Sequence, residues 1–185
     1  MRRCVAFLVL SVLLGTPASG FGDAIDVEAH RDGEGVVLEA SAWLHASVQQ
    51  VWSVLTDYER YPQFVPDLTE SRVIARNGKT ITLEQRGQAG FIFFHYPIEV
   101  QLEVVEQPPE RVTSHAISGN FKRMDGLYEL RPEGDLVHLV YRGRLVPAFS
   151  LPPVVGLPAV RSATERQFAA LVREIKRRVA LASER

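Results

Sequence analysis

One stretch of the chain, residues 51–66, reads VWSVLTDYERYPQFVP and places a short amphipathic helix directly before an aromatic turn. Ser47 stands where a helix N-cap is expected, just before the first apolar residue. Pro62 favours the first turn of a second short helix over continuation of the first. One face of this helix is predicted to be apolar, because steps of three and four residues separate Val48, Val51, Trp52 and Leu55.

The first twenty residues have the layout of a secretory signal. Arg2 and Arg3 precede an apolar run at residues 5–14, and small residues follow at 16–20. The run is shorter than a comfortable bilayer span, so residues 1–20 are predicted to be cleaved. The alternative is an uncleaved N-terminal anchor. We expect export, to the periplasm of a Gram-negative bacterium or by true secretion.

The composition of the mature protein excludes cysteine chemistry and gives no sign of nucleic-acid binding. Its 185 residues include one cysteine, Cys4, which lies inside the predicted signal. The mature chain would therefore lack disulfides, a thiol nucleophile and cysteine metal ligands. Loss of Arg2 and Arg3 leaves 19 basic against 22 acidic residues, a net charge near −3 that gives no footprint for nucleic acid. About 165 remaining residues suffice for one domain with a substantial core.

The rest of the chain predicts one α+β domain at residues 36–185, preceded by a flexible lead-in at 21–35. Asn77 and Gly78 form a two-residue hairpin signal, and residues 98–104 alternate apolar with polar throughout. Pro158 stands where a long amphipathic helix would begin. Strands are predicted at 36–44, 71–75, 80–87, 98–104, 111–118, 121–130 and 136–146. The apolar helix positions are Val160, Thr164, Phe168, Leu171, Ile175, Val179 and Ala182.

The motif at 51–66 resembles the start of the START-like superfamily, nearest to the polyketide cyclase/dehydrase and lipid-transport branch with its coenzyme-Q-binding members. The order of predicted elements and the segment 119–128 extend the resemblance over most of the mature chain. It implies a helix-grip fold, in which a curved antiparallel sheet wraps around a long C-terminal helix. An apolar ligand would lie between them. Tyr128 departs from the tryptophan common at this position in relatives.

The aromatic residues are the main candidates for a binding site. In a helix-grip fold the turn, the sheet and the long helix would bring them together as an apolar wall with a few polar tips. Ordinary core packing is the alternative for each residue. The candidate ligand-binding residues are Tyr61, Phe64, Phe91, Phe93, His115, Met124, Tyr128, Tyr141, Phe168 and Leu171.

No catalytic residue, metal site or cofactor is assigned. The five histidines lack metal-ligand spacing, and no nucleophile elbow, phosphate-binding loop or dinucleotide motif is present. His95 is expected at a solvated rim. An enzyme of the cyclase or dehydratase type would need an inward acid–base pair such as His115 with Tyr141.

Two apolar segments, residues 91–94 and 151–158, would form a patch for a membrane or partner if exposed, or covered structure if buried. Basic residues at 161, 166, 173 and 176–178 predict a solvated helix face, with attraction to anionic lipid as the weaker alternative. The leading hypothesis is an exported module that binds a lipid, isoprenoid quinone or polyketide-like molecule for transport or sequestration. The rivals are the cyclase-type enzyme and a periplasmic interaction protein without a cavity.

Overall fold

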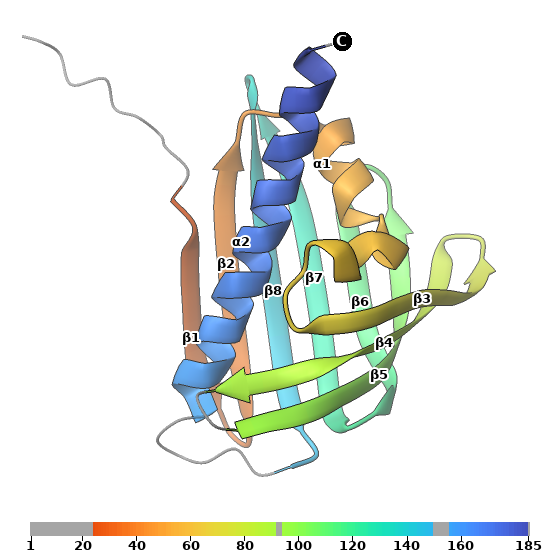
Figure 1. Ribbon diagram of the computed structural model, residues 1–185, viewed down its shortest axis with the longest axis vertical. Helices are drawn as coiled ribbons and strands as arrows, with labels where there is room; N and C mark the ends of the chain where they lie inside the picture. Colours follow the sequence, from red (N-terminus) through yellow and green to blue (C-terminus); the bar gives the residue numbers. More distant parts are fainter. Residues whose placement is uncertain (1–23, 92–93, 150–155, 185) are drawn as a thin grey trace, which may run out of the picture.

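The computed structural model describes residues 24–91, 94–149 and 156–184, which form an antiparallel sheet covered on one side by helices (Figure 1). In chain order the elements are β1 (Asp26–Asp32), β2 (Gly35–Leu44), α1 (Val48–Leu55), η1 (Tyr58–Gln63), β3 (Leu68–Asn77), β4 (Thr80–Phe91), β5 (Phe94–Gln107), β6 (Arg111–Gly119), β7 (Phe121–Glu133), β8 (Leu136–Pro147) and α2 (Gly156–Ser183). The predicted signal at 1–20 lies outside the described residues.

The eight strands lie in the order β1-β2-β8-β7-β6-β5-β4-β3, and every neighbouring pair is antiparallel. Register shifts interrupt the β3–β4, β5–β6 and β7–β8 pairs, and such bulges bend a sheet. Figure 1 shows β3, β4 and β5 crossing the lower part of the molecule at a steep angle to β1, β2 and β8. The curved antiparallel sheet with a long C-terminal helix confirms the predicted helix-grip architecture.

The helix at the start of the domain forms as its sequence predicts. The backbone nitrogen of Gln50 donates to Ser47 Oγ at 3.2 Å, and the backbone nitrogen of Ser47 donates to Gln50 Oε1 at 2.8 Å. This reciprocal capping box satisfies two donors at the helix start. The apolar face buries Val51, Val54 and Leu55 against the core.

The placement of Pro62 corrects the sequence prediction. Pro62 is the fifth residue of the 3-10 helix η1, which starts at Tyr58, so it does not begin a second helix. The turn is already fixed before the proline, because Arg60 donates its backbone nitrogen to the carbonyl of Asp57 at 3.0 Å. Burial of the Tyr58 side chain anchors the same turn.

The predicted lead-in also needs a correction, because residues 26–32 of it form the edge strand β1. Val27 is the one buried residue of this strand, so the strand lacks the alternation that would have revealed it. Elsewhere the observed strands contain the predicted ones and extend them by one to seven residues. The hairpin at Asn77 and Gly78 is confirmed, since Asn77 pairs with Thr80 and Gly78 has a φ of 60°.

The helix α2 lies along the concave side of the sheet and packs mainly on β1, β2 and α1 (Figure 1). Its buried face presents Phe168, Leu171, Val172 and Ile175 to the core. Pro158 lies in its first turn, where a missing backbone donor costs nothing. In the described part of the chain, none of the helices has the length and apolar character needed to cross a bilayer.

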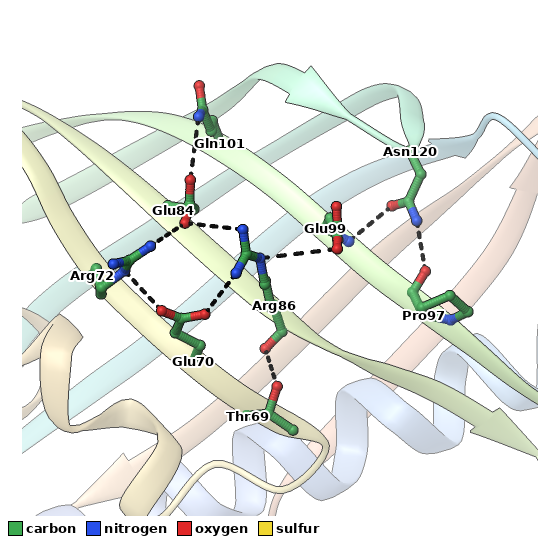
Figure 2. Close-up of polar contacts among 9 residues, drawn as sticks. All are labelled: Thr69, Glu70, Arg72, Glu84, Arg86, Pro97, Glu99, Gln101 and Asn120. Carbon is green, nitrogen blue, oxygen red and sulfur yellow. Dashed lines mark hydrogen bonds and ion pairs between the residues drawn. The ribbon is translucent and has the colours of Figure 1, made fainter.

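The convex side of the sheet carries ion pairs. Figure 2 shows the group on β3, β4 and β5, where Arg72 contacts Glu84 at 2.6 Å and Glu70 at 2.8 Å. Arg86 joins the same group, 3.1 Å from Glu70. The two arginines are about half exposed and the glutamates less so, and ion pairs that are partly solvated in this way contribute little to stability. Because side chains alternate along β4, Glu84 and Arg86 face water while their neighbours face the concave side.

Candidate functional site

A cavity of about 170 Å³ lies between α2, η1 and the concave face of the sheet. Most of its wall is aliphatic. Gln167, an exposed residue of α2, lines it together with Val65 and Leu68, so the cavity reaches the surface between α2 and the start of β3. The apolar lining residues are Leu55, Val65, Leu68, Leu83, Leu102, Val104, Val112, Met124 and Leu171.

Four tyrosines complete the wall, and two of them have hydroxyl groups engaged by the protein. Tyr61 donates its hydroxyl to the carbonyl oxygen of Leu55 at 2.6 Å. Tyr58 donates to Glu106 Oε1 at 3.0 Å. Burial, supported by nearby negative charge, raises the pKa of both phenols, so both stay protonated. These two tyrosines therefore act as structural parts of the wall.

Tyr128 and Tyr141 form the aromatic centre of the cavity. They pair directly across β7 and β8, with ring centroids 4.7 Å apart. Burial raises the pKa of Tyr128 well above its usual value and that of Tyr141 to about 12. Within the described residues, no hydrogen-bond partner is found for either hydroxyl. Both rings keep partial exposure because part of their surface faces the cavity.

Two glycines make room for the Tyr141 ring. Gly126 and Gly143 are register partners on β7 and β8, and Ser114 pairs with Gly126 from β6. A methyl group on Gly143 would lie 2.4 Å from the Tyr141 hydroxyl oxygen. A methyl group on Gly126 would lie 2.7 Å from Ser114 Oγ and 3.7 Å from the same phenol oxygen. The phenol of Tyr141 thus lies against the glycine pair, with its hydroxyl oxygen nearest to Gly143.

Among the described lining residues, none is ionisable at neutral pH. The polar lining groups besides the tyrosines are Gln85, Ser114 and Gln167, and Gln85 Nε2 donates to Ser71 Oγ at 3.1 Å. No group of three or more His, Asp or Glu side chains is placed to hold a metal ion in the described ranges. The site can therefore bury apolar surface and offer hydroxyl and amide groups to a guest.

Five of the candidate site residues come together in the cavity wall: Tyr61, Met124, Tyr128, Tyr141 and Leu171. Phe168 is 2% exposed and belongs to the solid core. Phe64 packs edge-on against Tyr61, with centroids 5.5 Å apart, and lies outside the lining. Phe93 and the side chain of Phe91 lie outside the described residues. Contact of any of these residues with a ligand stays a prediction.

His115 faces away from the cavity and corrects the placement that the enzyme hypothesis required. Its side chain is 61% exposed, and Nδ1 lies 2.5 Å from Asp125 Oδ1. The acid–base pair of His115 with Tyr141, which the enzyme hypothesis would need, is not formed. His138 stacks on Trp43 with ring centroids 4.2 Å apart, and His30 and His45 are exposed. The side chain of His95 lies outside the described residues.

The glycine pair, Ser114 and Gln85 were not predicted as site residues from the sequence. A signal existed for Gln85, because it shares the inward phase of β4 with Ile81 and Leu83. Ser114 has the same relation to Val112 on β6. A serine or glycine that faces inward does not by itself indicate a binding site. Its importance here depends on the Tyr141 ring, which lies in the space that a larger side chain would fill.

Ion pairs connect α2 to the segment that borders the cavity. Arg178 lies 2.7 Å from Asp57, directly before η1, and Arg166 lies 2.9 Å from Asp67, directly before β3. Glu174 binds Arg177 and Arg178 at 2.7 Å each, and hydrogen bonds from these arginines lower its pKa to about 2 despite partial burial. Much of the basic stripe of α2 is therefore paired, and most of its side chains are also exposed to solvent, as predicted.

The two apolar segments are only partly described. Phe91 and Phe94 pair at the end of the β4–β5 hairpin, but residues 92–93 and 150–155 lie outside the described residues. Nearby, Tyr96 is 39% exposed and stacks on Phe149 with centroids 3.7 Å apart. Whether the segments are exposed together stays a prediction.

The sequence was compared with known families and proteins. The family model described as "Polyketide cyclase / dehydrase and lipid transport" matches residues 44–172. No curated protein matches the sequence significantly.

Solved structures share the fold at low sequence identity. A STAR-related lipid transfer protein fragment from Xanthomonas axonopodis is 17% identical, with a TM-score of 0.68 over 84% of this chain and 96% of that one. Human StAR-related lipid transfer protein 5 is 14% identical, with a TM-score of 0.69 over 84% of each chain. The Zhui aromatase/cyclase from a Streptomyces species is 16% identical, with a TM-score of 0.65 over 78% of this chain and 96% of that one.

Proposed function

The chain belongs to the polyketide cyclase/dehydrase and lipid transport family, and from this premise we propose that it binds a hydrophobic small molecule under α2 for transport or sequestration. The observation that carries the proposal is the apolar, uncharged cavity. Burial of apolar surface contributes roughly 25 cal/mol per Å² to binding, so a cavity with such a wall favours an apolar ligand. The two lipid transfer proteins among the structural neighbours support the same class of ligand.

The size of the cavity limits what it holds in this conformation. Its 170 Å³ is close to the roughly 150 Å³ of an engineered cavity that binds benzene, and below the roughly 300 Å³ at which ligand pockets usually begin. One ring or a short chain segment fits inside. A lipid, an isoprenoid quinone or a polyketide-like molecule would need the seam between α2 and the η1–β3 segment to widen.

The ion pairs beside the cavity give this widening a physical basis. Arg166 and Asp67 directly adjoin the lining residues Gln167 and Leu68. Both side chains are partly solvated, and exposed pairs of this kind are worth at most about 1 kcal/mol. Loading through this seam would therefore cost little in broken ion pairs.

We also propose that the protein acts outside the cytoplasm, after cleavage of residues 1–20. The support is the order of charged, apolar and small residues in that segment. N-terminal sequencing of the protein from a periplasmic fraction tests it. Recovery of an intact Met1 from the membrane fraction would instead indicate the uncleaved anchor.

The direct test of ligand binding is native mass spectrometry of the protein after mild extraction, combined with titration of fluorescent lipid analogues. A cavity-filling variant, Met124→Trp, should reduce binding, whereas Ile117→Trp should not, because Ile117 is 52% exposed and outside the lining. A protein that carries no adduct and binds no analogue would refute the proposal. Equal binding by the two variants would show that a guest occupies some other place.

A further inference from the structure

We propose that the cavity selects an electrically neutral guest with a ring-sized head that carries a carbonyl oxygen as hydrogen-bond acceptor. This inference rests on the function proposed above and narrows its ligand class. Three features of the wall support it: the lack of counter-ions, two free phenol donors, and the small-residue row of Ser114, Gly126 and Gly143.

The first feature is electrostatic. A buried carboxylate or phosphate needs an opposite charge or several donors, because an unpaired ion is expensive to remove from water. Within the described lining, no arginine, lysine or histidine is present to supply that charge. The adjacent Glu106 is engaged by Tyr58 at 3.0 Å and lies 3.8 Å from Arg76. An anionic head inside the cavity would therefore be unpaired.

The second feature is the supply of donors. Tyr58 and Tyr61 use their hydroxyl protons within the protein, whereas the described residues offer no acceptor to Tyr128 or Tyr141. Because burial keeps both phenols protonated, each has one O–H to donate. An acceptor atom on the guest would satisfy these donors, and a pure hydrocarbon would leave them unpaired.

The third feature is the space in which the acceptor would sit. The Tyr141 hydroxyl and Ser114 Oγ both lie close to Gly126, since a methyl group there would be 3.7 Å from one and 2.7 Å from the other. Both hydroxyl groups therefore border a position that has no side chain of its own. The Tyr128 ring, 4.7 Å from that of Tyr141, provides an aromatic surface for a planar head.

Three probes of nearly equal shape separate these features. The neutral ketone is acetophenone, α-methylstyrene replaces its carbonyl oxygen with a methylene group, and benzoate carries a full negative charge at pH 7.5. Each probe has a single ring, which the cavity can hold. Titration calorimetry with the full-length purified protein gives the three dissociation constants. The ketone should bind about 5- to 10-fold more tightly than the hydrocarbon and at least about 100-fold more tightly than the carboxylate.

Two variants identify the donors. Tyr141→Phe and Tyr128→Phe keep the rings and remove one hydroxyl each. Either or both should weaken the ketone about 5- to 10-fold while the hydrocarbon retains its affinity, which also reports that the variant is folded. Three results would overturn this inference and leave the proposed function standing: equal affinity for the ketone and the hydrocarbon, tight binding of benzoate, or an unchanged affinity for the ketone in both variants. Failure of all three probes to bind the wild-type protein would instead count against the proposed function.

Discussion

The substitution Gly143→Ala tests whether the interior is hollow. Ordinary van der Waals contact begins near 3.4 Å, but the new methyl group would lie 2.4 Å from the Tyr141 hydroxyl oxygen and 2.9 Å from its Cζ. The phenol must therefore move by about 1 Å. Gly143 does not have a positive φ, so the alanine backbone is unstrained and the destabilising part of the effect comes from the ring.

The magnitude depends on what lies beside that ring. Overpacking a filled core costs about 1–3 kcal/mol. Here the ring can move into the 170 Å³ cavity, and replacing glycine in a compatible backbone gains about 0.4–1 kcal/mol through the unfolded state. The net change in unfolding free energy should stay within about 1 kcal/mol. Binding of acetophenone should weaken by about 10-fold or more, because the displaced phenol takes up the binding space.

Urea unfolding followed by tryptophan fluorescence and calorimetric titration measure the two quantities. Gly134→Ala is the matched control: it places the same methyl group in the β7–β8 turn, where nothing lies within 4 Å and φ is 62°. That variant should lose about 1 kcal/mol of stability through backbone strain and keep full binding. A loss of 2 kcal/mol or more in Gly143→Ala, with unchanged binding, would refute the reasoning by showing a solidly filled interior.

Three further substitutions probe the frame around the cavity. Phe168→Ala should destabilise the protein by about 3–5 kcal/mol in urea unfolding, because Phe168 is 2% exposed; a near-neutral effect would show that it lines empty space. Ser47→Ala should cost about 1 kcal/mol by the same measurement through loss of the capping box, and an unchanged unfolding midpoint would contradict the cap. The Glu174 pKa is lowered from 4.5 to about 2 in the folded state, so its contribution is complete above pH 4.5 and lost as the pH falls toward 2. Stability measured across that window should fall by up to about 3 kcal/mol on this account and fall less steeply in Glu174→Gln; parallel pH profiles would exclude the role.

Much of the fold is predictable because its patterns are strong and local. The spacing from Val48 to Leu55 specifies α1, and the alternation at residues 98–104 specifies most of β5. The edge strand β1 is different, because β2 and α2 supply its stability and one buried valine is too little to reveal it. Pro62 likewise tolerates a position late in η1 because contacts of Tyr58 fix the turn.

Site residues could be predicted from the sequence where the pattern of a strand shows clearly which side chains face inward. Tyr128 and Tyr141 belong to strands with a clear inward phase, and both line the cavity. The phase of β6 was ambiguous because Ile117 shares the outward phase with His115 and is itself 52% exposed. On α2, Phe168 follows the lining residue Gln167 by about 100° of helical rotation, which directs it into the packed core.

The contacts of α2 are unequal on its two sides, and this gives the molecule a direction of opening. Along β1 and β2 the helix is held by packing and by the bond from Arg161 Nε to the Val27 carbonyl at 3.0 Å. On the other side α1 also packs on the helix, but packing toward β4 is slight, and the solvated pair of Arg166 and Asp67 connects α2 to the start of β3. Salt screens such charges but leaves apolar packing intact. We therefore expect α2 to keep its contacts with β1 and β2 when the cavity opens and to separate from the sheet on the β4 side. This separation should become easier as ionic strength rises.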